Sequence, residues 1–263
     1  MLKNLNYDAI HRLDLFRLPC SDEELRKYLT KIREDGNGIS DKEQWQVQEF
    51  ITGQEYTAMA VVKCGTPVML TMSQSSASHF NYEHIDMPCI RTWHQDFFGK
   101  QPDVHGLFTI DFILNEKDGK PYAFECNPRL GSLSSLLLPV DNIVDVIMRP
   151  IDKEKSLHEQ LNMPKEGSGF ETYILMNEIF KLIEPTYYSE PFENFADVCT
   201  RTKGFFNLVT RANDPLIDGA DIMPFLMFNY FQVSYLLIDT LIGGNQWKKV
   251  DFQIGKVVQM GGD

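Results

Sequence analysis

Apolar positions in the first hundred residues alternate between the spacing of helices and that of strands. Ser21 followed by Glu24 is a capping box, and the apolar residues after it predict a helix that runs to about Arg33. Further on, short alternating runs separated by glycine turns predict an antiparallel meander. The expected strands are 45–51, 55–63 and 68–72, and the expected helix that follows is 88–98.

Two runs of bulky apolar residues between Asp111 and Arg129 flank a polar turn that contains Asp118-Gly119. This pattern predicts a β-hairpin. Strand side chains repeat every two residues, so Glu125 and Asn127 share one face. Pairing across the hairpin can bring Asp111 beside them.

The second half of the chain has weaker periodicity. Strands and helices segregate in runs, which predicts an α+β fold rather than a doubly wound sheet. The expected elements are helices in 131–138 and 140–148, a strand in 170–183, a loop-rich stretch with short helices in 185–220, and a strand-like piece in 247–258. The expected domains are 1–70, 71–150 and 151–263.

Residues 222–242 are almost continuously apolar over about the length of a transmembrane helix. The segment also contains Pro224, Asn229, Gln232 and Asp239, and polar groups such as these are costly in hydrocarbon. We therefore expect a buried core helix and no membrane contact. A membrane span or an interfacial helix is the alternative.

Composition narrows the class of protein. The chain has 263 residues and a net charge of −12, which argues against nucleic acid as a partner. The number of cysteines, five, is odd and none forms a CxxC pair, so neither a zinc site nor a disulfide framework is indicated. A reducing cytoplasm is the simplest location.

The face of the hairpin is chemically distinctive. Asp111, Glu125 and Asn127 offer two carboxylates and an amide oxygen, which are hard ligands suited to Mg²⁺ that bridges phosphates. Arg129 lies just beyond them, and its planar guanidinium suits a phosphoryl group during transfer.

A second group of candidate residues lies upstream, from Gln48 to Glu55. A strand edge there can offer backbone groups to an adenine, and the Glu55 carboxylate can accept hydrogen bonds from ribose hydroxyls. The alternative is an ordinary hairpin with a glutamate after its glycine turn.

Taken in order, these motifs resemble the ATP-grasp superfamily over residues 1 to about 135, and the string Glu-Cys-Asn-Pro-Arg at 125–129 is the most specific piece. The resemblance implies an ATP-grasp fold with ATP and Mg²⁺ as cofactors. It also implies a ligase that forms a C–N bond: the acceptor is phosphorylated, and an amine then captures the intermediate.

The resemblance also implies residue roles. Lys3 matches the first ATP-binding lysine, and Gln48 stands where a glutamate usually contacts the adenine amino group. Glu49 and Ile51 would offer backbone groups to the adenine, and Glu55 would hold the ribose. The implied metal ligands are Asp111, Glu125 and Asn127, and the implied catalytic residue is Arg129.

The chain departs from the family pattern in two places. Residues 7–14 stand where the family has a glycine-rich flap, so Arg12 or His11 would contact phosphate; the alternative is that Arg12 pairs with Asp8 or Asp14. The resemblance also implies that the N-terminal α/β domain of complete ligases is not contained in residues 1–263. We therefore keep open a truncated or non-catalytic nucleotide-binding protein, or a missing domain supplied by a partner chain. An unrelated α+β binding protein is the third interpretation.

A narrower resemblance uses 74–82, 223–227 and 247–263. These segments are similar to those of the ATP-grasp ligases of mycosporine biosynthesis. That resemblance implies a small-molecule acceptor, 4-deoxygadusol, and glycine as the amino acid joined to it.

Overall fold

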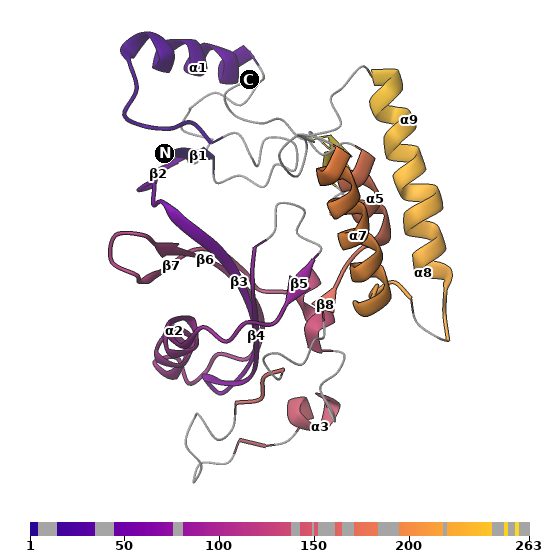
Figure 1. The fold of residues 1–263 in the computed structure, drawn as a ribbon. Coiled ribbons are helices and arrows are strands. Elements are labelled where there is room, and N and C mark those ends of the chain that lie inside the picture. Colours follow the sequence, from indigo (N-terminus) through magenta and orange to yellow (C-terminus); the bar gives the residue numbers. More distant parts are fainter. Residues whose placement is uncertain are drawn as a thin grey trace. The chain divides into compact units, whose positions relative to one another are not determined.

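The computed structural model forms two compact units, Met1–Ile51 with Phe225–Asp263 and Thr52–Pro224 (Figure 1). The residues that the structure describes are 1–4, 15–34, 45–75, 81–137, 143–148, 150–151, 161–164, 171–183, 195–217, 220–243, 250–251 and 256–257. The architecture mixes helices with antiparallel sheets, as the sequence predicted.

The first unit contains strand β1 (Leu2–Asn4), helix α1 (Asp22–Glu34) and strand β2 (Trp45–Val47). β1 and β2 pair antiparallel, and Leu2, Tyr28 and Ile32 form a small core. The predicted capping box is confirmed. The Ser21 N–H donates to Glu24 Oε2 at 2.8 Å, and the Glu24 N–H donates to Ser21 Oγ at 3.2 Å.

The strand expected over 45–51 is shorter in the structure, because β2 ends at Val47. Its partner β1 is also three residues long. Beyond the strand, the Gln48 carbonyl accepts a hydrogen bond from the Met1 amine, and the Gln48 N–H donates to Met1 O.

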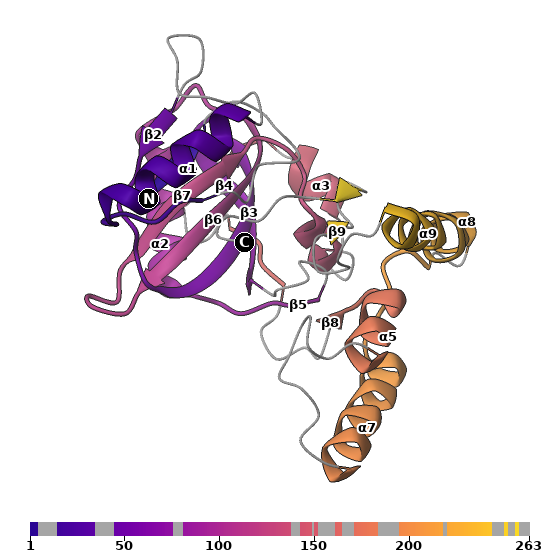
Figure 2. The same ribbon diagram turned by 90° about the horizontal axis from the view of Figure 1, so that it is seen from above.

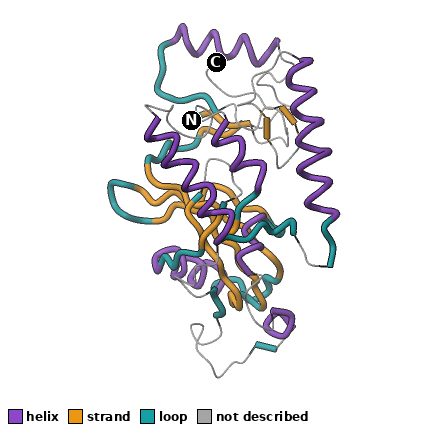
Figure 3. The backbone as a smooth tube through the Cα atoms, turned by 45° about the vertical axis from the view of Figure 1, so that its right-hand side comes forward, coloured by secondary structure: helices purple, strands orange, loops and turns teal. Residues whose placement is uncertain are grey.

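The apolar segment forms one continuous helix, Met223–Gly243, drawn unbroken in Figure 3. It consists of α8 (Met223–Leu226), the π-helical η2 (Met227–Gln232) and α9 (Val233–Gly243). We expected a buried helix, but this helix buries a single stripe made by Asn229, Val233, Leu236 and Thr240. By length and composition it is able to cross a membrane, a test that core helices of other proteins also pass.

Two short strands, β9 (Val250–Asp251) and β10 (Lys256–Val257), pair antiparallel after this helix. The sequence predicted strand-like structure in this region, and the described residues confirm it in part.

The second unit is built on a four-stranded antiparallel sheet with the order β4-β3-β6-β7. The strands are β3 (Gly53–Lys63), β4 (Thr66–Gln74), β6 (Gly106–Asn115) and β7 (Pro121–Asn127). The second and third strands of the predicted meander therefore share one sheet with the predicted hairpin. The first strand expected in the meander is β2, which pairs with β1 instead. Gly119 supplies the positive φ of 66° in the hairpin turn, a conformation that side chains with a Cβ rarely adopt.

Helix α2 (Pro88–Gly99) covers one face of this sheet (Figure 2), and its predicted position is confirmed. Alternate residues of the strands point into the layer between sheet and helix. Ala60, Leu70 and Phe112 are fully buried there, together with Phe98 of the helix.

The opposite face is covered over part of its length by the 3₁₀ helix η1 (Ser132–Leu137), with α3 (Ile143–Met148) beside it. Met59 and Met69 of the sheet pack there against Leu133 and Leu136. Toward one end of this face, the apolar residues give way to polar ones. The polar row across the four strands is Ser73, Thr57, Asp111 and Glu125.

The remaining elements of this unit differ from the prediction. The strand expected over 170–183 is only the two-residue β8 (Glu171–Thr172), which pairs with β5 (Tyr82–Glu83), and helix α5 (Leu175–Ile183) follows. The Leu175 N–H at the start of α5 is capped by the Asp214 carboxylate at 3.2 Å. A cap that comes from 39 residues away leaves no local signal in the sequence.

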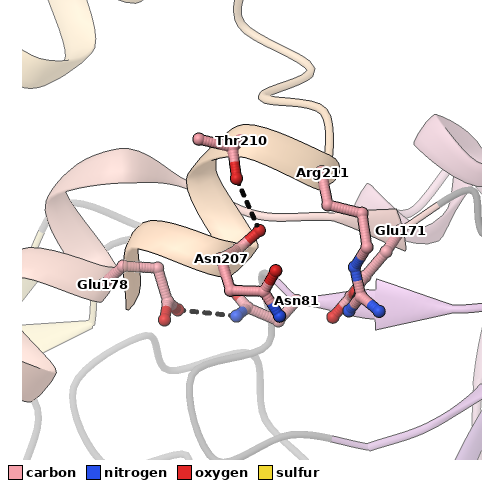
Figure 4. Close-up of polar contacts among 6 residues, drawn as sticks. All are labelled: Asn81, Glu171, Glu178, Asn207, Thr210 and Arg211. Carbon is pink, nitrogen blue, oxygen red and sulfur yellow. Dashed lines mark hydrogen bonds and ion pairs between the residues drawn. The ribbon is translucent and has the colours of Figure 1, made fainter. Parts of the chain in front are cut away.

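The stretch expected to be loop-rich contains the 17-residue helix α7 (Phe195–Arg211). Asp197 and Arg201 form an i,i+4 ion pair on it. Figure 4 shows how α5 and α7 are tied to the β5–β8 pair: Asn81 donates to Glu178 at 2.6 Å, and Arg211 forms an ion pair with Glu171.

Candidate functional site

The pairing of β6 with β7 places the predicted acids side by side. Asp111 lies directly opposite Glu125, and Thr109 lies directly opposite Asn127. Directly opposed residues of antiparallel strands point to the same face. The hypothesis that the hairpin joins Asp111 with Glu125 and Asn127 on one face is therefore confirmed as geometry.

A β-bulge produces this alignment. Phe112 pairs with Ala123 and Asp111 pairs with Glu125, so Phe124 is an extra residue without a partner on β6. In a regular ladder Asp111 would face Phe124, and Glu125 would point to the α2 side of the sheet. The bulge shifts the alternation by one residue, which is a common way to re-aim a side chain near a functional site.

Asp111 is partly buried and well connected. Thr57, its partner on the adjacent strand β3, donates a hydrogen bond from Oγ1 to Asp111 Oδ1 at 2.7 Å. The pKa of Asp111 is raised to about 6. Desolvation by burial is the main cause and the charges of Glu125 and Glu55 add to it, while the Thr57 hydrogen bond and the charge of Arg129 act in the opposite direction.

Glu125 and Asn127 lie at the exposed edge of the sheet. Asn127 donates from Nδ2 to Glu125 Oε1 at 3.0 Å. This hydrogen bond uses the amide nitrogen of Asn127 and does not involve its amide oxygen. Both side chains can therefore present oxygens on the side occupied by Asp111.

Arg129 follows directly on β7. Its N–H donates to Asn127 O at 2.8 Å, and its carbonyl accepts from Thr109 Oγ1 at 3.0 Å. Its charge reaches Asp111, since it lowers the pKa of that carboxyl. Gly131 continues the chain close to β6; a Cβ there would lie 3.0 Å from Thr109 Oγ1.

Glu55 belongs to the same end of the sheet. It lies two residues before Thr57 on β3 and therefore points to the same face, and its charge raises the pKa of Asp111. Of the predicted site residues, the structure brings five together in the second unit: Glu55, Asp111, Glu125, Asn127 and Arg129.

These residues fit a hard divalent cation. Asp111, Glu125 and Glu55 place more negative charge at this end of the sheet than Arg129 compensates, and bound Mg²⁺ would relieve their repulsion. Within the described residues, no group of three or more His, Cys, Asp or Glu side chains is placed so that it could hold a metal. The proposed set has two carboxylates and one amide, so the amide oxygen of Asn127 is needed to complete it.

The other predicted nucleotide-binding residues lie in the first unit. Lys3 is on β1 opposite Gln46, and Gln48 follows β2 with its backbone bound to Met1. Glu49 and Ile51 lie outside any strand. These four residues belong to the first unit, whereas the carboxylates belong to the second.

The sequence did not predict that hydroxyl groups surround Asp111. Thr57 contacts Asp111, Ser75 contacts Thr57 at 3.1 Å, and Tyr82 and Ser132 form a 2.6 Å hydrogen bond nearby. Burial is the main reason that the pKa of Tyr82 rises to about 12, and the charge of Asp111 adds to the rise. The signal for Thr57 is its position two residues after Glu55, on the same face of a predicted strand.

Some predictions fall outside the described residues. They include the 7–14 segment with Arg12 and His11, and residues 76–80. Much of 247–263, which contributes to the narrower resemblance, also lies outside.

Comparisons with known proteins give distant likenesses only. No protein-family model matches the chain, and no curated protein sequence matches it. An L-amino acid ligase from Bacillus licheniformis is similar at 15% identity and a TM-score of 0.32, over 51% of this chain and 36% of that one. The macrocyclase MdnB from Microcystis aeruginosa MRC is similar at 17% identity and a TM-score of 0.29, over 51% of this chain and 48% of that one.

The chain thus spans between about a third and a half of the length of these two solved structures. At this level of similarity neither assigns a function to it.

Proposed function

We propose that this protein is an ATP- and Mg²⁺-dependent ligase of the ATP-grasp type, which forms a C–N bond. The observation that carries the proposal is the register of Asp111 with Glu125, with Asn127 at the end of the same strand and Arg129 two residues beyond it. Two carboxylates, an amide oxygen and a guanidinium at one sheet end are the groups that Mg²⁺ and a transferring phosphoryl group require.

In this proposal, Asp111, Glu125 and Asn127 hold Mg²⁺, which when bound neutralises charge on the β- and γ-phosphates of ATP. Glu55 holds the ribose, while Lys3 and the backbone of Glu49 and Ile51, with Gln48, bind the rest of the nucleotide. An acceptor oxygen attacks the γ-phosphorus, the bond from phosphorus to the β–γ bridging oxygen breaks, and ADP leaves, while Arg129 stabilises charge on the phosphoryl group during transfer. An amine nitrogen then attacks the acceptor carbon that carries the phosphate; phosphate leaves and the nitrogen loses a proton.

The acceptor class follows from the narrower sequence resemblance. We propose a small-molecule acceptor of the 4-deoxygadusol type, glycine as the amine, and a cytoplasmic location. A further domain or a partner chain would complete the acceptor site. Nucleic acid is not proposed as a partner, because the net charge of −12 would repel phosphate chains.

The test uses Glu125→Gln, which removes one charge without changing size, and Glu116→Gln as a matched control. Glu116 lies in the exposed turn of the same hairpin. ATP with Mg²⁺ should raise the melting temperature of the wild-type chain, because a ligand that binds only the folded state stabilises it. Glu125→Gln should abolish both this shift and Mg²⁺-dependent phosphate release, whereas Glu116→Gln should retain both.

A wild-type chain that ATP with Mg²⁺ does not stabilise would contradict the proposal. Stabilisation without phosphate release, in the presence of glycine and a deoxygadusol-type acceptor, would instead favour a non-catalytic nucleotide-binding protein. Wild-type behaviour of Glu125→Gln would remove the metal assignment.

A further inference from the structure

Three side chains on adjacent strands of the second unit form an ordered series of hydrogen bonds. Thr57 Oγ1 lies 2.7 Å from Asp111 Oδ1, and Ser75 Oγ lies 3.1 Å from Thr57 Oγ1. Thr57 is on β3 directly opposite Asp111 on β6, and Ser75 follows the end of β4.

The direction of these bonds is fixed by chemistry. An ionised carboxylate only accepts hydrogen bonds, so the one hydroxyl proton of Thr57 is donated to Asp111. Thr57 Oγ1 then acts as acceptor toward Ser75, which donates its own hydroxyl proton. The order is Ser75 to Thr57 to Asp111.

We infer that Thr57 and Ser75 are positioning residues for the metal site: together they hold Asp111 Oδ1, so that Oδ2 is the oxygen presented to Mg²⁺. This inference rests on the proposed function. A ligating carboxylate that is itself hydrogen-bonded is fixed in orientation, and loss of such an outer partner typically weakens metal binding about 10- to 100-fold.

The backbone anchors the far end of the series. The Ser75 N–H donates to the Glu55 carbonyl at 2.9 Å. Glu55 is the residue proposed to hold the ribose, so the residue that supports the metal ligand is tied to the strand that carries the ribose ligand. Ser75 therefore has a fixed place from which to donate to Thr57.

The test measures Mg²⁺ affinity by calorimetry on the full chain saturated with a non-hydrolysable ATP analogue. Thr57→Val keeps the size of the side chain and removes the hydroxyl, and it should weaken Mg²⁺ binding about 10-fold or more. Thr57→Ser restores the hydroxyl and should remain within about threefold of wild type, while Ser75→Ala should lose about two- to fivefold.

Thr71→Val is the matched control. Thr71 lies on β4, on the same face of the sheet, but its hydroxyl contacts His84 Nδ1 at 3.3 Å rather than Asp111. Its Mg²⁺ affinity should equal that of wild type, although its melting temperature falls. A merely structural role for Thr57 would likewise lower the melting temperature and leave Mg²⁺ affinity unchanged.

The outcomes separate the two proposals. Wild-type Mg²⁺ affinity in Thr57→Val would overturn the positioning role and leave the metal site standing, whereas a wild-type chain that binds no Mg²⁺ would overturn both. If Thr57→Val does not fold, Ser75→Ala decides, and unchanged affinity in that variant would overturn the positioning role.

Discussion

The α2 face of the four-stranded sheet and the polar end of its opposite face, which carries Asp111, are made from the same strands but differ in burial and in polarity. On the α2 face, Phe98 and Phe112 are fully buried, and even the imidazole of His94 is enclosed by aromatic rings. On the other face, the row through Thr57, Asp111 and Glu125 is polar, hydrogen-bonded and partly open to solvent.

The difference shows how stability and chemistry can be separated within a single layer. The α2 face removes apolar surface from water, which stabilises the fold. The Asp111 face holds carboxylates close together, and the raised pKa of Asp111 shows that its ionised form is disfavoured there. Such an arrangement lowers stability and is typical of sites that await a ligand.

The largest effect is expected from the removal of a buried side chain on the α2 face. Phe112→Ala should cost about 3–5 kcal/mol of unfolding free energy, because Phe112 is fully buried and packs against Trp93 with ring centroids 5.0 Å apart. Urea denaturation would measure the loss. Phe97→Ala on α2, where the side chain is 42% exposed, should cost less than about 2 kcal/mol. Equal losses would show that the α2 face is not the main core.

A second test measures how the stability contributed by the α2 face depends on pH. Burial lowers the pKa of His94 to about 4, while histidine in an unfolded chain titrates near 6.5. The unfolded state therefore takes up a proton first, so stability is complete above about pH 6.5 and is lost as the pH falls toward 4. His94 should contribute a loss of about 2 kcal/mol between pH 7.5 and pH 5.

Urea denaturation at the two pH values would measure this loss, and His94→Leu should remove it. The exposed His105 offers the control, since His105→Gln should keep the full acid sensitivity. The same acid loss in His94→Leu as in wild type would place the pH response elsewhere.

A smaller effect of pH on stability, with the opposite sign, is expected from Asp111 on the other face of the sheet. The folded-state pKa of Asp111 is raised, so the stability contributed by its protonated form is present at low pH and is lost as the pH rises through about 6. At pH 7.5 without Mg²⁺, Asp111→Asn should therefore raise the melting temperature by about 2 °C while removing Mg²⁺ binding.

Thermal unfolding of Asp118→Asn provides the comparison. Hydrogen bonds from the Lys120 N–H and Tyr122 Oη favour the ionised form of Asp118 and lower its pKa, so this substitution should shift the melting temperature downward. If the melting temperature falls in Asp111→Asn as well, the idea that the ionised Asp111 carboxylate lowers the stability of the fold is wrong.

Features that depend on neighbouring residues in the chain could be predicted from the sequence. The capping box at Ser21 and Glu24 and the turn at Asp118-Gly119 are local, and both are confirmed. Helix α5 was predicted as a strand, because Asp214, which caps it, is distant in sequence.

The site followed the same rule. Alternation correctly placed Glu125 and Asn127 together, since it needs only one strand. The contact of Thr57 with Asp111 depends on the register of β3 with β6, which residue patterns in either strand alone do not determine.

The extra residue at Phe124 has a consequence for how this protein can change. The site depends on the number of residues in the strand as much as on their identities. One residue more or fewer between the turn and Glu125 would turn the side chains at the end of β7 to the opposite face of the sheet. A deletion there would send a carboxylate into the aromatic layer and take it away from Asp111. This hairpin can therefore tolerate substitutions, whereas insertions and deletions between Gly119 and Glu125 would disrupt the site.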